Sequence, residues 1–166
     1  AGSRGFNAIN DTCNPMDDHG HGTHVAGTIG AVGNNGVGVA GVNWTASMMG
    51  LKFLDSTGVG TTADAIKALE FAIKTKAALG AAANVRILNN SWGGGGFSLA
   101  LQDQIEATKA SDMLFVAAAG NDSLNNDIVP HYPSSHTTDS LISVAANNNQ
   151  DQHASFSNFG ATSVDL

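Results

Sequence analysis

The sequence predicts an α/β fold with a mostly parallel sheet and helices on both faces. Short apolar runs rich in β-forming residues alternate with longer segments of helical period from residue 48 onward. Several of these runs are continuously apolar, as expected for strands that are covered on both faces. Glycine, asparagine, aspartate and serine occupy the junctions. Together these three observations favour repeated βαβ units.

The length and net charge of the chain limit the classes of protein to which it can belong. The 166 residues suit a single domain spanning residues 1–166. The formal net charge is −7, and no run of basic residues occurs, so nucleic acid and anionic membrane are excluded as main partners. No apolar run approaches the roughly 20 residues that span a bilayer. Cys13 is the single cysteine, so no internal disulfide is expected.

Four segments are predicted to be strands, and polar or small residues follow several of them. The strands are residues 48–53, 85–90, 113–118 and 141–145. In parallel sheets the functional groups collect beyond the carboxyl ends of the strands. Asn89-Asn90-Ser91 and Ala119-Gly120-Asn121 are therefore expected at one edge of the sheet.

Two segments between these strands are predicted to be helices. Residues 62–78 and residues 98–110 carry apolar side chains at helical spacing. Thr61 or Thr62 can cap the first helix, and Ser98 is the expected cap of the second. Both helices are expected to cross from one strand to the next in the right-handed sense.

The densest polar cluster lies at residues 17–24, directly before small residues at helical spacing. Its sequence is Asp17-Asp18-His19-Gly20-His21-Gly22-Thr23-His24. The pattern places His21 at a helix start, where a neutral imidazole could accept a proton as a general base. Metal binding by the three histidines and two aspartates competes with this interpretation. The His-Glu-x-x-His spacing of metalloproteases is absent, however.

Two other features receive structural interpretations. The string Gly36-Val37-Gly38-Val39-Ala40-Gly41 matches the dinucleotide-binding fingerprint. Since no strand is predicted before it and a strand rather than a helix follows, we interpret it as a coil of tight turns. The remaining histidines are interpreted as ordinary loop residues, namely His131, His136 and His153.

Five stretches, in the same order along the chain, resemble the subtilisin-like serine proteases, the subtilase or peptidase S8 family. His21-Gly22-Thr23-His24-Val25-Ala26-Gly27-Thr28-Ile29 resembles the motif of the catalytic histidine. Leu88-Asn89-Asn90-Ser91-Trp92-Gly93 resembles the strand end that pairs with substrate. Val116-Ala117-Ala118-Ala119-Gly120-Asn121 resembles the segment with the oxyanion-hole asparagine. Tyr132-Pro133-Ser134 and residues 154–160 match two further stretches, so the resemblance covers nearly all of residues 5–166.

The resemblance implies a three-layer subtilisin-like fold, incomplete because the first central strand and the C-terminal serine helix are missing. It also implies a serine endopeptidase, a hydrolase that cuts peptide bonds through an Asp-His-Ser triad. His21 is the expected base, and Asn121 the expected donor to the oxyanion. Six residues are expected to contact a peptide or protein substrate: Ser91, Trp92, Gly93, Ala118, Ala119 and Gly120.

The family's aspartate and serine motifs do not occur in the 166 residues. Asp11-Thr12-Cys13 lacks the required glycine, and no Gly-Thr-Ser-Met-Ala string is present. The chain is therefore expected to be a segment of a longer protease, to be inactive by itself and to self-associate through its incomplete sheet. A non-catalytic, peptide-binding relative of the family is the alternative.

Residues 33–39 resemble the family's calcium loop. Asn35 is the expected side-chain ligand, with the carbonyls of Val37 and Val39 beside it. No cofactor is expected for the chemistry itself, so calcium would be structural. The resemblance further implies an extracellular, secreted protein and a cis peptide between Tyr132 and Pro133.

Overall fold

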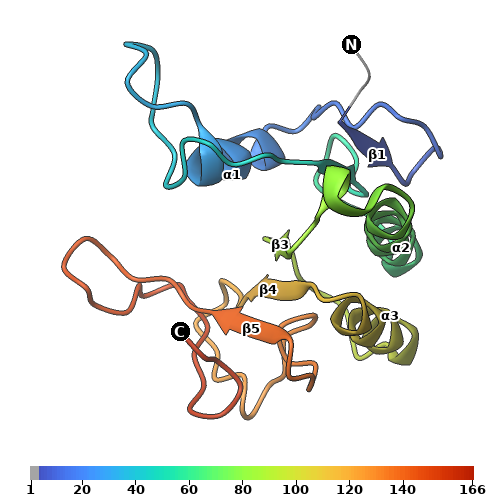
Figure 1. Cartoon of the computed structure of the whole chain (residues 1–166). Helices are drawn as coiled ribbons and strands as arrows, with labels where there is room; N and C mark the ends of the chain where they lie inside the picture. Colours follow the sequence, from blue (N-terminus) through green and yellow to red (C-terminus); the bar gives the residue numbers. More distant parts are fainter. Residues whose placement is uncertain (1–3) are drawn as a thin grey trace. The chain divides into compact units, whose positions relative to one another are not determined.

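The computed structural model describes residues 4–166, which form two compact units (Figure 1). The first unit ends at Phe71 and the second begins at Ala72, so the boundary falls within helix α2 (Thr62–Leu79). The single domain expected over residues 1–166 stays a prediction. Within the described residues, no helix is both long and apolar enough to cross a membrane.

The first unit contains a two-stranded parallel sheet and helix α1. Strand β1 (Gly5–Asn7) pairs with strand β2 (Gly50–Lys52), and α1 (His21–Gly30) lies between them in sequence. The ring of Phe6 stacks on Phe71 of α2 with 4.5 Å between centroids. Sequence analysis missed β1, because three residues are too few to show a period.

Helix α2 begins as expected and buries mainly alanines along one face. The Thr61 hydroxyl accepts from the backbone N–H of Asp64 (3.1 Å) and donates to its carboxylate (2.7 Å). The fully buried positions are Ala65, Ala68, Leu69 and Ala72. Small alanines allow close packing, which leaves the larger isoleucines of the helix half-buried beside them. A short 3₁₀ turn (Gly80–Ala83) follows.

The second unit is built on a three-stranded parallel sheet. Its strands are β3 (Ile87–Asn90), β4 (Leu114–Ala118) and β5 (Leu141–Val144), in the order β3-β4-β5. Helix α3 (Leu99–Ala110) connects β3 to β4, and the Ser98 hydroxyl caps it by accepting from the N–H of Leu101 (3.3 Å). The parallel pairing and the alternation of strands and helices confirm the predicted α/β class.

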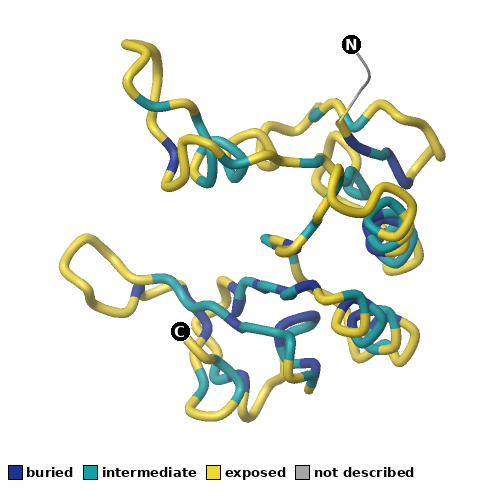
Figure 2. Tube along the Cα trace, viewed as in Figure 1, coloured by how far each residue is buried: buried dark blue, intermediate teal, exposed yellow. Residues whose placement is uncertain are grey.

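The core of the second unit lies between α3 and the sheet (Figure 2). Leu101 and Ile105 of α3 are buried as predicted, and Phe115 and Ala117 of β4 are buried with them. The Thr108 hydroxyl is also buried and donates to the carbonyl of Ile105 (2.7 Å). The sheet and its strand ends therefore rest on a packed layer.

An aromatic cluster is formed by Phe97, which precedes α3, and by two residues of the loop between β4 and β5. The His136 ring lies 4.7 Å from that of Tyr132 and 5.5 Å from that of Phe97, centroid to centroid. The peptide bond between Tyr132 and Pro133 is cis, as the resemblance implied. His136 is only 4% exposed, and neither ring nitrogen hydrogen-bonds another described residue. His136 lies in a loop, as interpreted from the sequence, but the sequence did not indicate its burial.

The buried His136 predicts that acid destabilises the protein. Burial lowers the pKa of its imidazole below the ordinary value, so the unfolded chain binds a proton first as the pH falls. The free energy of unfolding is therefore complete above about pH 6.5 and declines below it. We expect the melting temperature to fall between about pH 7.5 and pH 5, and to fall less in His136→Phe.

The exposed residue His153 provides the matched control, His153→Phe, which should leave this dependence unchanged. His131, whose pKa burial also lowers, adds to the loss in the same pH range, so His136→Phe should remove only part of it. Equal pH dependence in His136→Phe and in the unsubstituted chain would show that the ring is not buried as described.

Candidate active site

Two neighbouring hollows open at the carboxyl ends of the strands in the second unit. The first has a volume of about 280 Å³ and is lined by residues 89–91, 116–121 and 144–146 with Ser157. The second, about 240 Å³, is lined by residues 91–93, by Ala118, by residues 120–122 and by His131. Asn121 and all six residues predicted to contact substrate line one hollow or both.

The end of β3 is ordered by its own asparagines. Buried Asn90 donates to the carbonyl of Leu88 (2.9 Å) and accepts from the indole N–H of Trp92 (3.1 Å). Asn89 donates to the Ser91 hydroxyl (2.9 Å). These bonds fix the backbone just beyond the strand and hold the Trp92 ring against the second hollow.

The end of β4 turns sharply at Gly120, whose φ is +117°. A Cβ placed on Gly120 would lie 2.5 Å from Asn158 Nδ2 and 3.0 Å from His131 Cδ2. Only glycine suits both the backbone angle and the space. Asn121 follows at once, is exposed, and its carboxamide hydrogen-bonds no other described residue. The carboxamide is therefore free to donate to a ligand.

A buried pair of amides holds this turn on both sides of Asn121. Asn158, 1% exposed, accepts from the N–H groups of Asp122 (2.8 Å) and Leu124 (3.2 Å). Its own amide nitrogen donates to Asn126 Oδ1 (3.0 Å), and Asn126 donates to the carbonyl of Ala119 (2.8 Å). Sequence analysis assigned a role to neither residue, because asparagines in loops carry no periodic signal that would show a buried pair.

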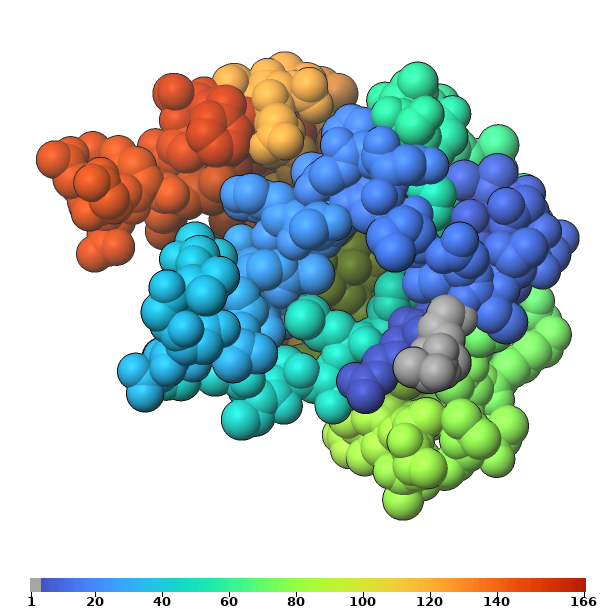
Figure 3. Space-filling model, turned by 90° about the horizontal axis from the view of Figure 1, so that it is seen from above, coloured from blue at the N-terminus to red at the C-terminus, as the bar shows by residue number. Residues whose placement is uncertain are grey.

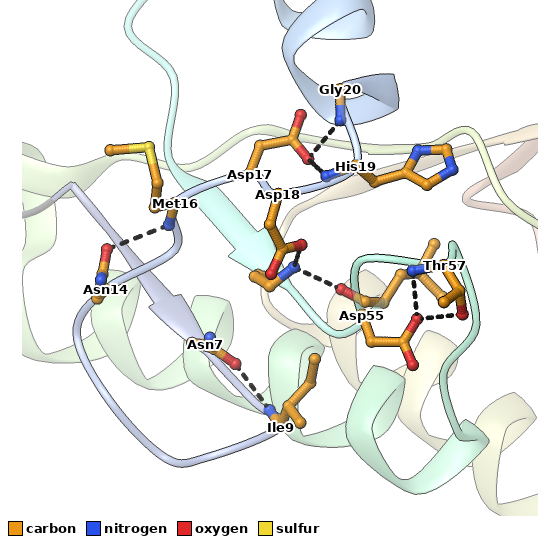
Figure 4. Close-up of polar contacts among 12 residues, drawn as sticks. Asn7, Ile9, Asn14, Met16, Asp17, Asp18, His19, Gly20, Asp55 and Thr57 are labelled. Carbon is orange, nitrogen blue, oxygen red and sulfur yellow. Dashed lines mark hydrogen bonds and ion pairs between the residues drawn. The ribbon is translucent and has the colours of Figure 1, made fainter.

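In the first unit, His21 is the first residue of α1, as the pattern predicted, and its side chain is exposed. The Asp17 carboxylate accepts hydrogen bonds from the N–H groups of His19 (3.0 Å) and Gly20 (3.0 Å) (Figure 4). It accepts a third from the N–H of Thr23 (2.8 Å). It also accepts from the Thr23 hydroxyl, which is the main reason that the Asp17 pKa lies well below its usual range. Asp17 therefore fixes the backbone that leads into His21.

The metal interpretation of this cluster finds no support. Asp18 pairs with Lys52 (2.6 Å), and Lys52 also donates to the carbonyl of Leu54 (2.7 Å). The ring of His19 lies beside Gly58, where an added Cβ would be 3.2 Å from Nε2. Among residues 4–166, no three His, Cys, Asp or Glu side chains converge as a metal site would require.

Residues 33–39 form an exposed loop on the outside of the first unit (Figure 3). Asn35 Oδ1 accepts from the N–H of Val37 (3.0 Å), and Val37 and Val39 are exposed. The loop contains no carboxylate, whereas calcium takes about 6–8 oxygen ligands that include carboxylates. The loop alone does not fit calcium, and the prediction for Asn35, Val37 and Val39 remains untested.

The comparisons with known proteins agree with this architecture. The family model described as "Subtilase family" matches residues 3–166, so the chain belongs to the subtilase family. The crystal structure of a cold adapted subtilisin-like serine proteinase superimposes with a TM-score of 0.77 at 28% identity. That alignment covers 97% of this chain and 54% of the solved one. The expected subtilisin-like fold is thereby confirmed.

Individual relatives have similar identity over nearly the whole chain. Subtilisin-like protease 2 of Plasmodium falciparum (isolate 3D7) is 38% identical over 157 residues, which are 92% of this chain and 11% of that protein. Subtilisin E of Bacillus subtilis (strain 168) is 38% identical over 159 residues, 95% of this chain and 39% of the relative. The chain thus spans well under half the length of these relatives.

The buried amide pair predicts a specific loss of order around Asn121. In Asn158→Ala the N–H groups of Asp122 and Leu124 lose their acceptor, and Asn126 loses a partner. Because buried polar groups are left unsatisfied, we expect the free energy of unfolding to fall by about 1–3 kcal/mol. Hydrogen exchange should quicken at Asp122 and Leu124. The exposed Asn147→Ala is the control, and equal effects of the two substitutions would refute the role of the pair.

The Asp17 cluster predicts that the start of α1 depends on one carboxylate. Asp17→Ala removes the acceptor for three N–H groups, so we expect a loss of about 0.5–2 kcal/mol, the range measured for helix-capping side chains. Asp17→Asn keeps an oxygen acceptor and should recover part of this loss. Chemical denaturation measures the energy, and the exchange rate of the Thr23 amide reports the helix start. An unchanged rate in Asp17→Ala would contradict the assignment.

Proposed function

We propose that this chain supplies the general base, the oxyanion donor and the peptide-binding strand ends of a subtilisin-type serine endopeptidase. One observation carries the proposal. In a chain of the subtilase family, the free carboxamide of Asn121 stands at the carboxyl end of β4, beside the hollows lined by the predicted substrate residues. The substrate class is peptide or protein.

The roles follow from what amide hydrolysis requires. A hydroxyl nucleophile must lose its proton, and the leaving amine must gain one. The exposed imidazole of His21 takes the first proton and returns it to the amine. The Asn121 carboxamide donates to the oxygen on which negative charge develops, and it needs no rearrangement because buried Asn158 holds its loop.

The strand ends suit an extended peptide. Gly93 and Gly120 have no side chains, and the space that a Cβ would take is filled by His131 and Asn158 of this chain, which pack against the strand ends. A peptide in this position adds as a strand, with main-chain hydrogen bonds for affinity and pockets for alternate side chains. Ser91, Trp92, Ala118 and Ala119 form the walls.

The reaction needs a serine nucleophile and a triad aspartate, whose motifs the 166 residues do not contain. We infer that the chain by itself binds peptide but does not hydrolyse it. The second candidate is a peptide-binding relative without catalysis, in which the strand ends and the two hollows bind peptide and no triad forms. We also propose an extracellular protein, and self-association through β3, a strand at the edge of its sheet.

A chimera tests the catalytic roles. Residues 4–166 replace the matching segment of Subtilisin E, which supplies the serine and aspartate. The chimera should cleave a peptide substrate, and Asn121→Ala should lower kcat about 10²–10³-fold, a magnitude established on the corresponding subtilisin asparagine and carried over from it. His21→Ala should lower kcat further, because proton transfer is lost altogether.

The control is His24→Ala, which removes an exposed histidine from the same helix and should keep activity. The unfused chain should show no turnover. Should the folded chimera keep full activity without His21 or Asn121, the proposed roles are wrong. Turnover by the unfused chain that His21→Ala abolishes would instead refute its inactivity.

A further inference from the structure

Among residues 4–166, six asparagine side chains fold back onto the main chain just beyond them. In each, the side-chain oxygen accepts from the backbone N–H two positions later, at 2.9–3.2 Å. This bond closes a small ring that contains both the carboxamide carbon Cγ and the backbone nitrogen of the next residue, so the two atoms are held near each other. The six are Asn7, Asn14, Asn35, Asn43, Asn125 and Asn148.

Three of the six are followed by a backbone nitrogen that is not free to react. It is either the ring nitrogen of a proline or an N–H that already donates to a main-chain carbonyl. These nitrogens belong to Pro15, to Ala8 (bonded to Lys52, 2.8 Å) and to Asn126 (bonded to Phe159, 2.7 Å). Asn35, Asn43 and Asn148 remain. All three are exposed, and the N–H that follows each of them donates to no other described residue.

Of these three, only Asn35 is followed by glycine. Trp44 follows Asn43 and Asn149 follows Asn148, and each carries a side chain that shields its backbone nitrogen. Gly36 has a φ of +70°, and no atom lies within 4 Å of the position that a Cβ would take. Its nitrogen is therefore open on both sides and can move towards Cγ of Asn35.

The loop that contains Asn35 is closed at its base. The N–H groups of Gly41, Val42 and Asn43 donate to three carbonyls at the end of α1 and just beyond it (2.9–3.0 Å). Residues 34–40 between these bonds and α1 are all exposed. Water therefore reaches Asn35, and the loop can change without unwinding the helix.

We propose that Asn35 deamidates spontaneously in the folded protein, with water as the only other reactant. The Gly36 nitrogen gives up its proton to water and attacks Cγ of Asn35, so a new N–C bond forms. The bond from Cγ to the side-chain nitrogen breaks, and ammonia leaves with that proton. Water then opens the cyclic imide at either carbonyl, which gives aspartate or isoaspartate. This modification site is independent of the proposed function, because it needs neither peptide nor triad.

Either product adds one negative charge to a chain whose formal net charge is −7. Aspartate keeps a side-chain oxygen for the N–H of Val37, as Asn35 Oδ1 does now (3.0 Å). Isoaspartate instead carries the main chain through the side-chain carbons, so the loop gains a backbone atom and this hydrogen-bonded ring is lost. Because three hydrogen bonds close the loop at its base, we expect the change to stay within residues 32–40.

Ageing of the 166-residue chain tests the proposal. The chain is kept in neutral buffer with EDTA, so that no divalent cation binds the Asn35 oxygen, and its more acidic form is isolated by anion exchange. Fragment mass spectra then locate the increase of about 1 Da that deamidation causes. We expect Asn35 to react at least about tenfold faster than Asn43 or Asn148. Asn35→Gln should abolish this acidic form, since glutamine would have to close a larger ring.

A matched pair of variants tests the geometric argument at a second position. Asn148 has the same hydrogen bond to the N–H two residues later (2.9 Å), and it lacks only the glycine. Asn149→Gly should therefore make Asn148 react at a rate similar to that of Asn35. Asn149→Ala keeps a Cβ beside the nitrogen and should leave Asn148 as slow as before. Circular dichroism spectra verify that both variants are folded.

Three results would overturn the inference. If Asn35 reacts no faster than Asn43 and Asn148, the glycine and the open loop do not select it. If Asn35 reacts in urea but not in the folded chain, the loop holds Cγ away from the Gly36 nitrogen. If Asn149→Gly leaves Asn148 unreactive, the hydrogen-bonded ring followed by glycine is not sufficient, and the reason given for Asn35 is wrong.

Discussion

The second unit depends on one buried interaction, the hydrogen bond between the side chains of Asn126 and Asn158. Each amide reaches a different part of the turn after β4, since Asn126 binds the carbonyl of Ala119 and Asn158 binds the N–H groups of Asp122 and Leu124. A buried amide without partners is costly, so the pair tolerates few other arrangements of the turn. This turn fixes the positions of Gly120 and Asn121, which line both hollows.

Local signals predicted most of the secondary structure. Sequence analysis correctly predicted the caps at Thr61 and Ser98 and the two longer helices. Each of these features depends only on a few residues that are neighbours in the sequence. The strands were placed to within about three residues, the usual uncertainty at element ends. Strand β1 was not predicted, because its three residues form a strand only by pairing with β2, which lies more than forty positions later in the sequence.

The site was predicted in part for the same reason. Asn121 and the six residues around it belong to contiguous motifs at strand ends, and the structure brings them to the same hollows. The supporting residues come from distant loops. Asn158 is 36 positions from Asp122, and His131 reaches the second hollow through a turn. The spacing of residues in the sequence therefore predicts neither the bond from Asp122 to Asn158 nor the place of His131 in the hollow. Asp17 was noticed only as a candidate in the competing metal interpretation, because its bonds to backbone N–H groups depend on the turn before α1.

The claim that Asn158 acts through Asn121 is tested most directly by a double-mutant cycle in the Subtilisin E chimera. If Asn158 serves to hold the oxyanion donor, Asn158→Ala should lower kcat only while Asn121 is present. The double variant should then be as slow as Asn121→Ala alone, with KM changed little between them. If the fold decreases in kcat of the two single variants multiply in the double variant instead, Asn158 acts on catalysis independently of Asn121. The turn after β4 would then not be what positions the oxyanion donor.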